Sequence, residues 1–143
     1  MKRISLALLL ATLLAGNAMA VDTATLDVTA TVIETCRFDS NGGIINFGNI
    51  DALNPADILG QTASANPYFT CSAGTAYTIT DDSAANPLDN GTDTIAYALN
   101  YTAGGNATGA SEELVVTGDL LGADYAGVSA GIYNATVTFT INP

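Results

Sequence analysis

Hydrophobic and polar residues alternate most regularly near the two ends of the chain. Between Leu26 and Val32 every second residue is apolar, and the residues between them are Asp or Thr. From Tyr133 to Ile141 the same alternation runs unbroken for nine residues. Because successive side chains of a β-strand point to opposite faces, both segments are predicted to be strands with one apolar face.

Between these ends the chain is rich in Thr, Val, Ile and Tyr, and turn residues interrupt it at short intervals. This composition is typical of short antiparallel strands. A flexible loop is expected over Gly104–Gly109, and no segment of useful length has helical periodicity. Further strands are predicted at Ile44–Ile50, Asn66–Ser72, Ala76–Thr80, Thr94–Thr102 (with Ile95, Tyr97, Leu99 and Tyr101 on one face), Glu113–Thr117 and at Leu120 and Leu121.

About seven short strands in some 120 residues favour an all-β fold, a Greek-key sandwich of immunoglobulin-like size. The chain has no Trp, so an antibody-type core is not expected. A final strand at a sheet edge, with no residues after it to cover that edge, would leave unpaired backbone groups and a groove. The alternating segment at Leu26–Val32 fits either the first strand of a complete sandwich or a strand given to such a groove.

The first twenty residues have the pattern of an export signal. Lys2 and Arg3 precede an apolar stretch over residues 4–15, and Ala18 and Ala20 form a small-residue cleavage site. The apolar stretch is shorter than the roughly 20 residues that a membrane-spanning helix needs. We therefore expect cleavage after Ala20, which leaves 123 of the 143 residues, the size of one domain.

Charge excludes several classes of partner. After cleavage Arg37 is the only basic residue and opposes fourteen Asp and Glu, a net charge of −13. Such a surface repels phosphate groups, so neither nucleic-acid binding nor membrane insertion is expected.

The chain has two cysteines, Cys36 and Cys71. In an exported protein a disulfide between them is the default expectation. Metal thiolates and a reactive thiol are the alternatives, and the lack of any His and of a second cysteine pair disfavours them.

Residues for catalysis are scarce, so no enzyme activity and no cofactor are expected. Without His, the usual acid–base and nucleophile arrangements are missing. The acidic pairs Asp81-Asp82 and Glu112-Glu113 are adjacent, so strand geometry points their side chains apart, which suits solvated loops better than a two-carboxylate glycosidase. The sequence Asp89–Asp93 resembles a calcium loop but lacks the length and distal Glu of an EF-hand, and its Asn-Gly favours a hairpin turn.

An ordered set of segments gives the chain a family resemblance. It resembles the spore coat protein U family of secreted pilins, which are subunits of archaic chaperone–usher pili. The segments that carry the resemblance are Leu26–Val32, Cys36, Ile45–Gly48, Phe69–Cys71, Ala76–Ile79 and Gly131–Ile141.

The resemblance implies an incomplete immunoglobulin-like sandwich that lacks its last strand. A periplasmic chaperone and an outer-membrane usher would be partners during export, and neighbouring pilin subunits would be partners in a head-to-tail fibre at the cell surface. The chain ends in Asn142-Pro143 where the family often ends in an apolar residue. By position, the donor strand would present Leu26, Val28, Ala30 and Val32, and the acceptor groove would include Val137, Phe139 and Ile141.

The organisation expected is a signal peptide at residues 1–20, a donor-strand extension at 21–33 and a pilin domain at 34–143. The function expected is a structural subunit of a fimbria that supports adhesion or biofilm formation. The alternatives are a self-contained secreted binding module, such as an adhesin, and a structural protein of a spore or outer coat.

Overall fold

The computed structural model describes residues 22–143, and the predicted signal peptide lies outside the described residues. Residues 22–31 form one unit and residues 32–143 another. The first unit contains no helix or strand, and all its side chains are exposed. No helix in the described part of the chain is long and apolar enough to cross a membrane.

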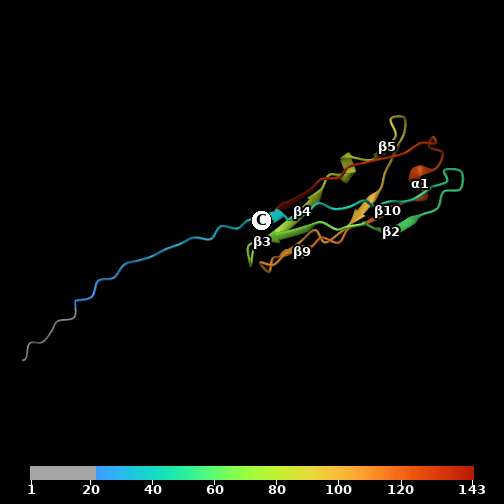
Figure 1. The fold of residues 1–143 in the computed structure, drawn as a ribbon. Helices are drawn as coiled ribbons and strands as arrows, with labels where there is room; N and C mark the ends of the chain where they lie inside the picture. Colours follow the sequence, from blue (N-terminus) through green and yellow to red (C-terminus); the bar gives the residue numbers. More distant parts are fainter. Residues whose placement is uncertain (1–21) are drawn as a thin grey trace, which may run out of the picture. The chain divides into compact units, whose positions relative to one another are not determined.

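The regular secondary structure of the second unit is almost entirely β, with antiparallel pairing throughout, so the predicted all-β class is confirmed (Figure 1). In chain order its elements are β1 (Cys36–Phe38), β2 (Ile58–Thr62), β3 (Tyr68–Cys71), β4 (Ala76–Asp81), the 3-10 helix η1 (Ser83–Ala85), β5 (Leu88–Asp89), β6 (Thr94–Ile95), β7 (Ala98–Asn100), β8 (Gly104–Asn106), β9 (Glu112–Glu113), β10 (Thr117–Leu120), α1 (Gly122–Tyr125) and β11 (Phe139–Asn142).

Three of the sheets have three strands each, in the orders β1-β3-β9, β2-β10-β7 and β11-β4-β8, and β5 pairs with β6 in a hairpin. Thus β1 and β11 are each the edge strand of their sheet. These two edge strands contact each other at the end of the unit where the chain terminates (Figure 1).

The buried side chains form two clusters. The first is centred on Phe69, Ile79 and Leu114. The second is centred on Ile95 and Leu120, near β2 and α1. Alternation explains how the strands build these clusters, since Tyr77 and Ile79 of β4 are buried while Ala76, Thr78 and Thr80 are exposed.

The disulfide predicted between Cys36 and Cys71 is confirmed. It joins directly opposed residues of β1 and β3, whose Cα atoms lie 4.0 Å apart. It closes a loop over a sequence separation of 35 residues. The edge strand β1 is thereby covalently attached to the middle strand of its sheet.

The longest predicted strand pairs over only part of its length. Side chains alternate as expected, because Val137, Phe139 and Ile141 are half-buried while the threonines between them are exposed. Ladder pairing with β4 is restricted to β11, because β4 ends at Asp81 and the chain then turns into η1. Pairing resumes only at one bridge, between Asp89 and Asn134.

Three other predicted strands are also modified, and one of them, Glu113–Thr117, has only its two end residues in strands, in β9 and β10. The segment Ile44–Ile50 has no assigned strand, although Gly43 and Ile44 exchange backbone hydrogen bonds with residues 64 and 65. The segment Thr94–Thr102 is divided into β6 and β7, which belong to different sheets. Its apolar face is as predicted, with Ile95 buried and the three later residues half-buried.

The prediction of a flexible loop over Gly104–Gly109 is wrong. Residues Gly104–Asn106 form β8 and pair with β4. Glycine occupies this strand because a Cβ at Gly104 would lie 2.7 Å from the Tyr77 carbonyl oxygen. The glycine that suggested flexibility is therefore required by a close approach of two strands. The strands β1 and β2 and the single turn α1 were not predicted.

Candidate functional site: a hydrophobic groove between two edges

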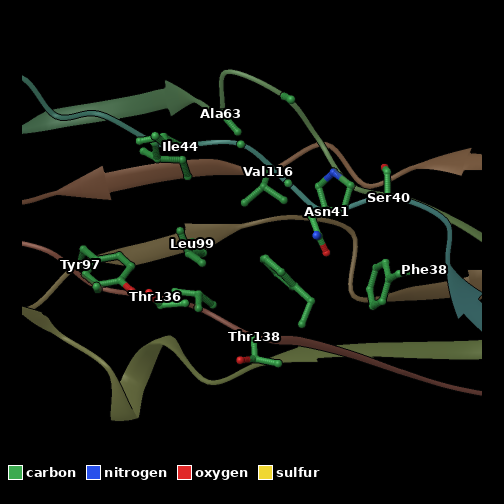
Figure 2. Close-up of a pocket in the computed structure, with 18 of the residues that line it drawn as sticks. Phe38, Ser40, Asn41, Ile44, Ala63, Tyr97, Leu99, Val116, Thr136 and Thr138 are labelled. Carbon is green, nitrogen blue, oxygen red and sulfur yellow. The ribbon is translucent and has the colours of Figure 1, made fainter.

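A groove of about 630 Å³ lies between two segments that are far apart in the sequence (Figure 2). One wall follows β1 and consists of residues 38–47, and the other consists of residues 135–139. Figure 2 shows Leu99 and Val116 in the middle of the groove, with Phe38 and Tyr97 toward opposite ends. The groove is lined by Phe38, Ser40, Asn41, Gly42, Gly43, Ile44, Ile45, Phe47, Ala63, Ala65, Pro67, Leu88, Tyr97, Leu99, Val116, Ala135, Thr136, Val137, Thr138 and Phe139.

The two walls run in opposite directions. Phe38 packs on the same core cluster as Phe139, at one end of the groove. Phe47 packs on the other cluster together with Tyr133, at the other end. The groove therefore connects the two clusters, and side chains inserted into it would contact both.

On the first wall, the backbone hydrogen bonds join the segment to residues 64–68. The amides of Asp39 and Ser40 donate to the Tyr68 carbonyl oxygen at 2.7 and 3.3 Å, and the Gly43 amide donates to the Ala65 carbonyl oxygen at 2.7 Å. These bonds attach the wall to the first residue of β3 and to the chain just before it. Within the described residues, no backbone hydrogen bond joins residues 39–47 to the second wall.

On the second wall, the turn after β4 leaves a stretch of backbone without a ladder partner. Within the described residues, no hydrogen bond joins residues 135–137 to another backbone group. The Thr138 amide instead donates to the Asp82 carboxylate at 2.7 Å. A side chain thus replaces the strand that ended at Asp81 and fixes the direction of this wall.

The lining is apolar or neutral, with no Asp, Glu, Lys or Arg among its residues. Its most polar large side chain, Tyr97, uses its hydroxyl to donate to the Asn86 carbonyl oxygen at 3.0 Å. Burial, reinforced by the charges of Asp81 and Asp82, raises the pKa of Tyr97, which therefore stays neutral. Such a surface suits apolar side chains and excludes charged ones.

Below the second wall, Tyr101 braces Phe139. The two rings meet edge to face, with centroids 5.2 Å apart. The Tyr101 hydroxyl donates to the Asp81 carboxylate at 2.6 Å. Burial and this hydrogen bond raise the pKa of Tyr101 to about 12. Burial alone would raise the pKa of Asp81, but hydrogen bonds from Ser83 and Tyr101 outweigh it and lower that pKa below its usual value.

Two of the three residues predicted for the acceptor groove line it, and the third does not. Val137 and Phe139 are on the second wall. Ile141 packs against the first core cluster instead, beside Phe139.

The residues predicted for the donor strand lie outside any ladder. Residues 22–35 form no strand, and the side chains of Leu26, Val28 and Val32 are 85–87% exposed. Ala30 is also exposed. The alternating apolar face of this segment is therefore not used within the described chain.

Sequence reasoning missed most of the groove lining. Phe38 and Leu99 come from β1 and β7, Val116 lies between β9 and β10, and only the fold brings them together. Phe47 lies in Ile45–Gly48, one of the segments that carry the family resemblance. The alternation of apolar and polar residues did not predict that it lies on the wall of the groove.

The other acidic candidates have structural roles in the described chain. Asp89–Asp93 spans the β5–β6 hairpin, as its Asn-Gly predicted, and the Gly91 amide donates to Asp89 at 2.6 Å. Asp81 and Asp82 bind separate donors, Tyr101 and the Thr138 amide. Glu112 accepts from Thr108 at 3.2 Å. No cluster of three or more metal-ligating side chains occurs in residues 22–143.

The chain thus forms an antiparallel, disulfide-linked β-domain with an uncharged groove between two segments that are far apart in the sequence. A family model, the Spore Coat Protein U domain, matches residues 22–99, which is more than half of the chain. The chain therefore belongs to the spore coat protein U family, a family of pilin-type structural domains found at cell surfaces. No curated protein matches it.

Proposed function

We propose that this protein is a structural subunit of an extracellular pilus, assembled by donor-strand complementation through a chaperone–usher pathway. The observation that carries the proposal is the groove, whose two walls run antiparallel over an apolar floor and share no backbone hydrogen bond within the described residues. An inserted strand would pair with both edges, which is the β-augmentation mode of recognition.

The donor in this proposal is the N-terminal segment of a neighbouring subunit. Its side chains Leu26, Val28, Ala30 and Val32 occupy one face, and Asp27 lies on the other face. The uncharged lining selects the first face, because burying the Asp27 carboxylate there without a partner would be costly. Burial of each Val or Leu contributes about 1.5–3 kcal/mol, so several such contacts would make a very stable joint.

Head-to-tail donation of this kind generates a filament, because the contact does not close on itself. The chaperone would occupy the same groove before assembly, and the usher would exchange it for the next subunit. Export through the periplasm follows in this proposal from the predicted signal peptide, and the exchange takes place after export.

The test is binding of a fluorescent peptide with the sequence of residues 22–33 to the chain lacking residues 22–31. Three peptides are compared: the native sequence, Val28→Asp and Thr29→Asp. The two substitutions add the same charge to adjacent positions on opposite faces. We expect native and Thr29→Asp peptides to bind, and Val28→Asp to bind at least about 100-fold more weakly, because it buries an unpaired carboxylate.

The same truncated chain should fail to form filaments, since it keeps an acceptor groove but has no donor. Full-length chain under the same conditions should form a ladder of oligomers. A truncated chain that still polymerises, or a native peptide that does not bind, would remove the basis for donor-strand assembly.

A further inference from the structure

The residues that join the N-terminal segment to β1 are held by hydrogen bonds to Ser72, the residue that follows β3. The Ser72 amide donates to the Thr35 carbonyl oxygen at 2.9 Å. The Ser72 hydroxyl donates to the Ile33 carbonyl oxygen at 3.3 Å and lies 3.2 Å from the Thr35 hydroxyl. We call these three residues, Ile33, Thr35 and Ser72, the exit clamp.

The protons in the exit clamp can be assigned. A serine hydroxyl has one proton, and the Ile33 carbonyl oxygen can only accept, so the Ser72 proton points to Ile33. The Thr35 hydroxyl must then donate to the Ser72 oxygen. Both side chains are therefore used in one chain of hydrogen bonds, which extends the β1–β3 ladder beyond the Cys36–Cys71 pair.

We propose that the exit clamp keeps the donor segment out of the groove of its own subunit, so that it is available to a second copy. This inference rests on the function proposed above and adds a positioning role for Thr35 and Ser72. It addresses a problem of geometry, because the groove begins directly beside β1, and the donor segment of the same chain is therefore its nearest possible occupant.

Linker length limits how the donor can enter its own groove. The wall over residues 38–47 is about 30 Å long, at about 3.3 Å per residue. Three linker residues, 33–35, span at most about 11 Å. The donor of the same chain therefore cannot run in the direction of β1, which would place Val32 at the far end of the groove, beside Phe47.

Only a tight hairpin would bring the donor into its own groove, with the reversal at residues 33–35. That reversal removes the Ile33 and Thr35 carbonyl groups from Ser72, so the exit clamp must open. A reversal of the chain before Ile33 would preserve the clamp. It would, however, place Ala30 and Val32 in the turn, so that neither side chain could enter the groove. The clamp thus penalises self-insertion in either case, whereas a second copy enters without disturbing it.

The test uses the exported chain, unfolded in guanidinium with its disulfide intact and refolded by dilution to low concentration. Light scattering gives the monomer fraction, and labelled peptide 22–33 reports which monomers have an open groove. Closed monomer is the monomer that does not take up peptide. The double variant Thr35→Val with Ser72→Ala removes the two hydroxyls of the clamp, and Ser129→Ala, a remote exposed serine, is the control.

We expect the closed-monomer population of the double variant to rise about five-fold relative to wild type, because each lost side-chain hydrogen bond changes an equilibrium by roughly two-fold to ten-fold. The Ser129→Ala control should match wild type. Thr35→Val alone, which leaves the Ser72 hydroxyl bonded to Ile33, should give a smaller rise and also serves if the double variant does not refold.

The two proposals fail differently. If open monomer binds the peptide but the closed fraction is the same in wild type, Thr35→Val and the double variant, the exit clamp has no positioning role and donor-strand assembly is unaffected. If no preparation binds the peptide, the groove is not an acceptor and both proposals are overturned.

Discussion

Asp82 accepts a hydrogen bond from the Thr138 amide at 2.7 Å and so takes the place of the strand that ends one residue earlier. This side chain holds the second wall of the groove while leaving the opposite edge of residues 135–137 without a ladder. The wall is consequently ordered before any partner strand arrives.

Replacing Asp82 with Ala should therefore weaken the groove more than the whole fold. We expect a loss of about 1 kcal/mol in the free energy of unfolding, measured with urea, because the contact is exposed. Affinity for peptide 22–33 should fall about five-fold. Asp124→Ala, which removes the same charge from α1, is the control and should change neither quantity. Equal losses in both variants would indicate a general effect of charge.

Tyr101 should make the domain sensitive to alkali. Burial and the Asp81 carboxylate raise its pKa to about 12, so the folded protein holds this proton more tightly than the unfolded chain, whose Tyr pKa is 10.0. The stabilisation is complete below pH 10 and is lost as the pH rises toward 12.

Tyr101→Phe keeps the ring against Phe139 and should flatten the fall in unfolding free energy between pH 10 and 12. Urea unfolding at several pH values measures this slope. A residual slope is expected from Tyr77 and Tyr97, since burial also raises both of their pKa values. An unchanged slope in the variant would show that Tyr101 ionises as freely in the folded state as in the unfolded chain.

Gly118 should be intolerant of a side chain. A Cβ there would lie 3.0 Å from Cζ of Phe47 and 3.1 Å from Cγ2 of Ile45, two residues of the first wall. Gly118→Ala should cost about 1–3 kcal/mol of unfolding free energy and weaken peptide binding. Phe47→Leu added to Gly118→Ala should recover part of the stability, and a double-mutant cycle measures this coupling. Strict additivity would mean that the ring does not cause the strain.

The disulfide should supply a large share of stability. A closed loop of about 35 residues contributes roughly 3–4 kcal/mol by restricting the unfolded chain. Cys36→Ser with Cys71→Ser should lower the unfolding free energy by about that amount in urea titrations. A loss below 1 kcal/mol would show that the unfolded chain is already compact around this loop.

Alternation in the sequence predicted which faces are buried better than it predicted which backbones pair. Side chains from Val137 to Ile141 alternate as expected, although Ala135 is exposed, yet only β11 forms a ladder. Burial follows from the residue itself, whereas pairing also depends on where its partner strand ends. Here the partner strand β4 ends at Asp81, and the sequence of the C-terminal segment contains no signal for that end point.

Glycines and contacts between residues far apart in the sequence also limited what could be predicted from the sequence. A loop was predicted at Gly104 and Gly105 because glycine favours flexible backbone. In the structure both residues belong to β8, where Tyr77 approaches too closely to leave free space for a side chain. The two cysteines allowed one long-range pairing to be predicted, because a chain with two cysteines and a predicted export signal has only one intramolecular disulfide to form. The groove floor, by contrast, depends on Leu99 of β7 meeting Val116, which lies just before β10, and no local pattern specifies this contact.

The position of the Cys36–Cys71 bond has a mechanical consequence. Tension applied along the N-terminal segment first loads the hydrogen bonds of Ile33 and Thr35 to Ser72 and then reaches Cys36. An edge strand held only by hydrogen bonds would peel away from there one bond at a time. The cross-link passes that load at once to β3, the middle strand of its sheet. Under tension the sheet must therefore yield as a block, so the oxidised domain should withstand pulling forces that would unzip the reduced one.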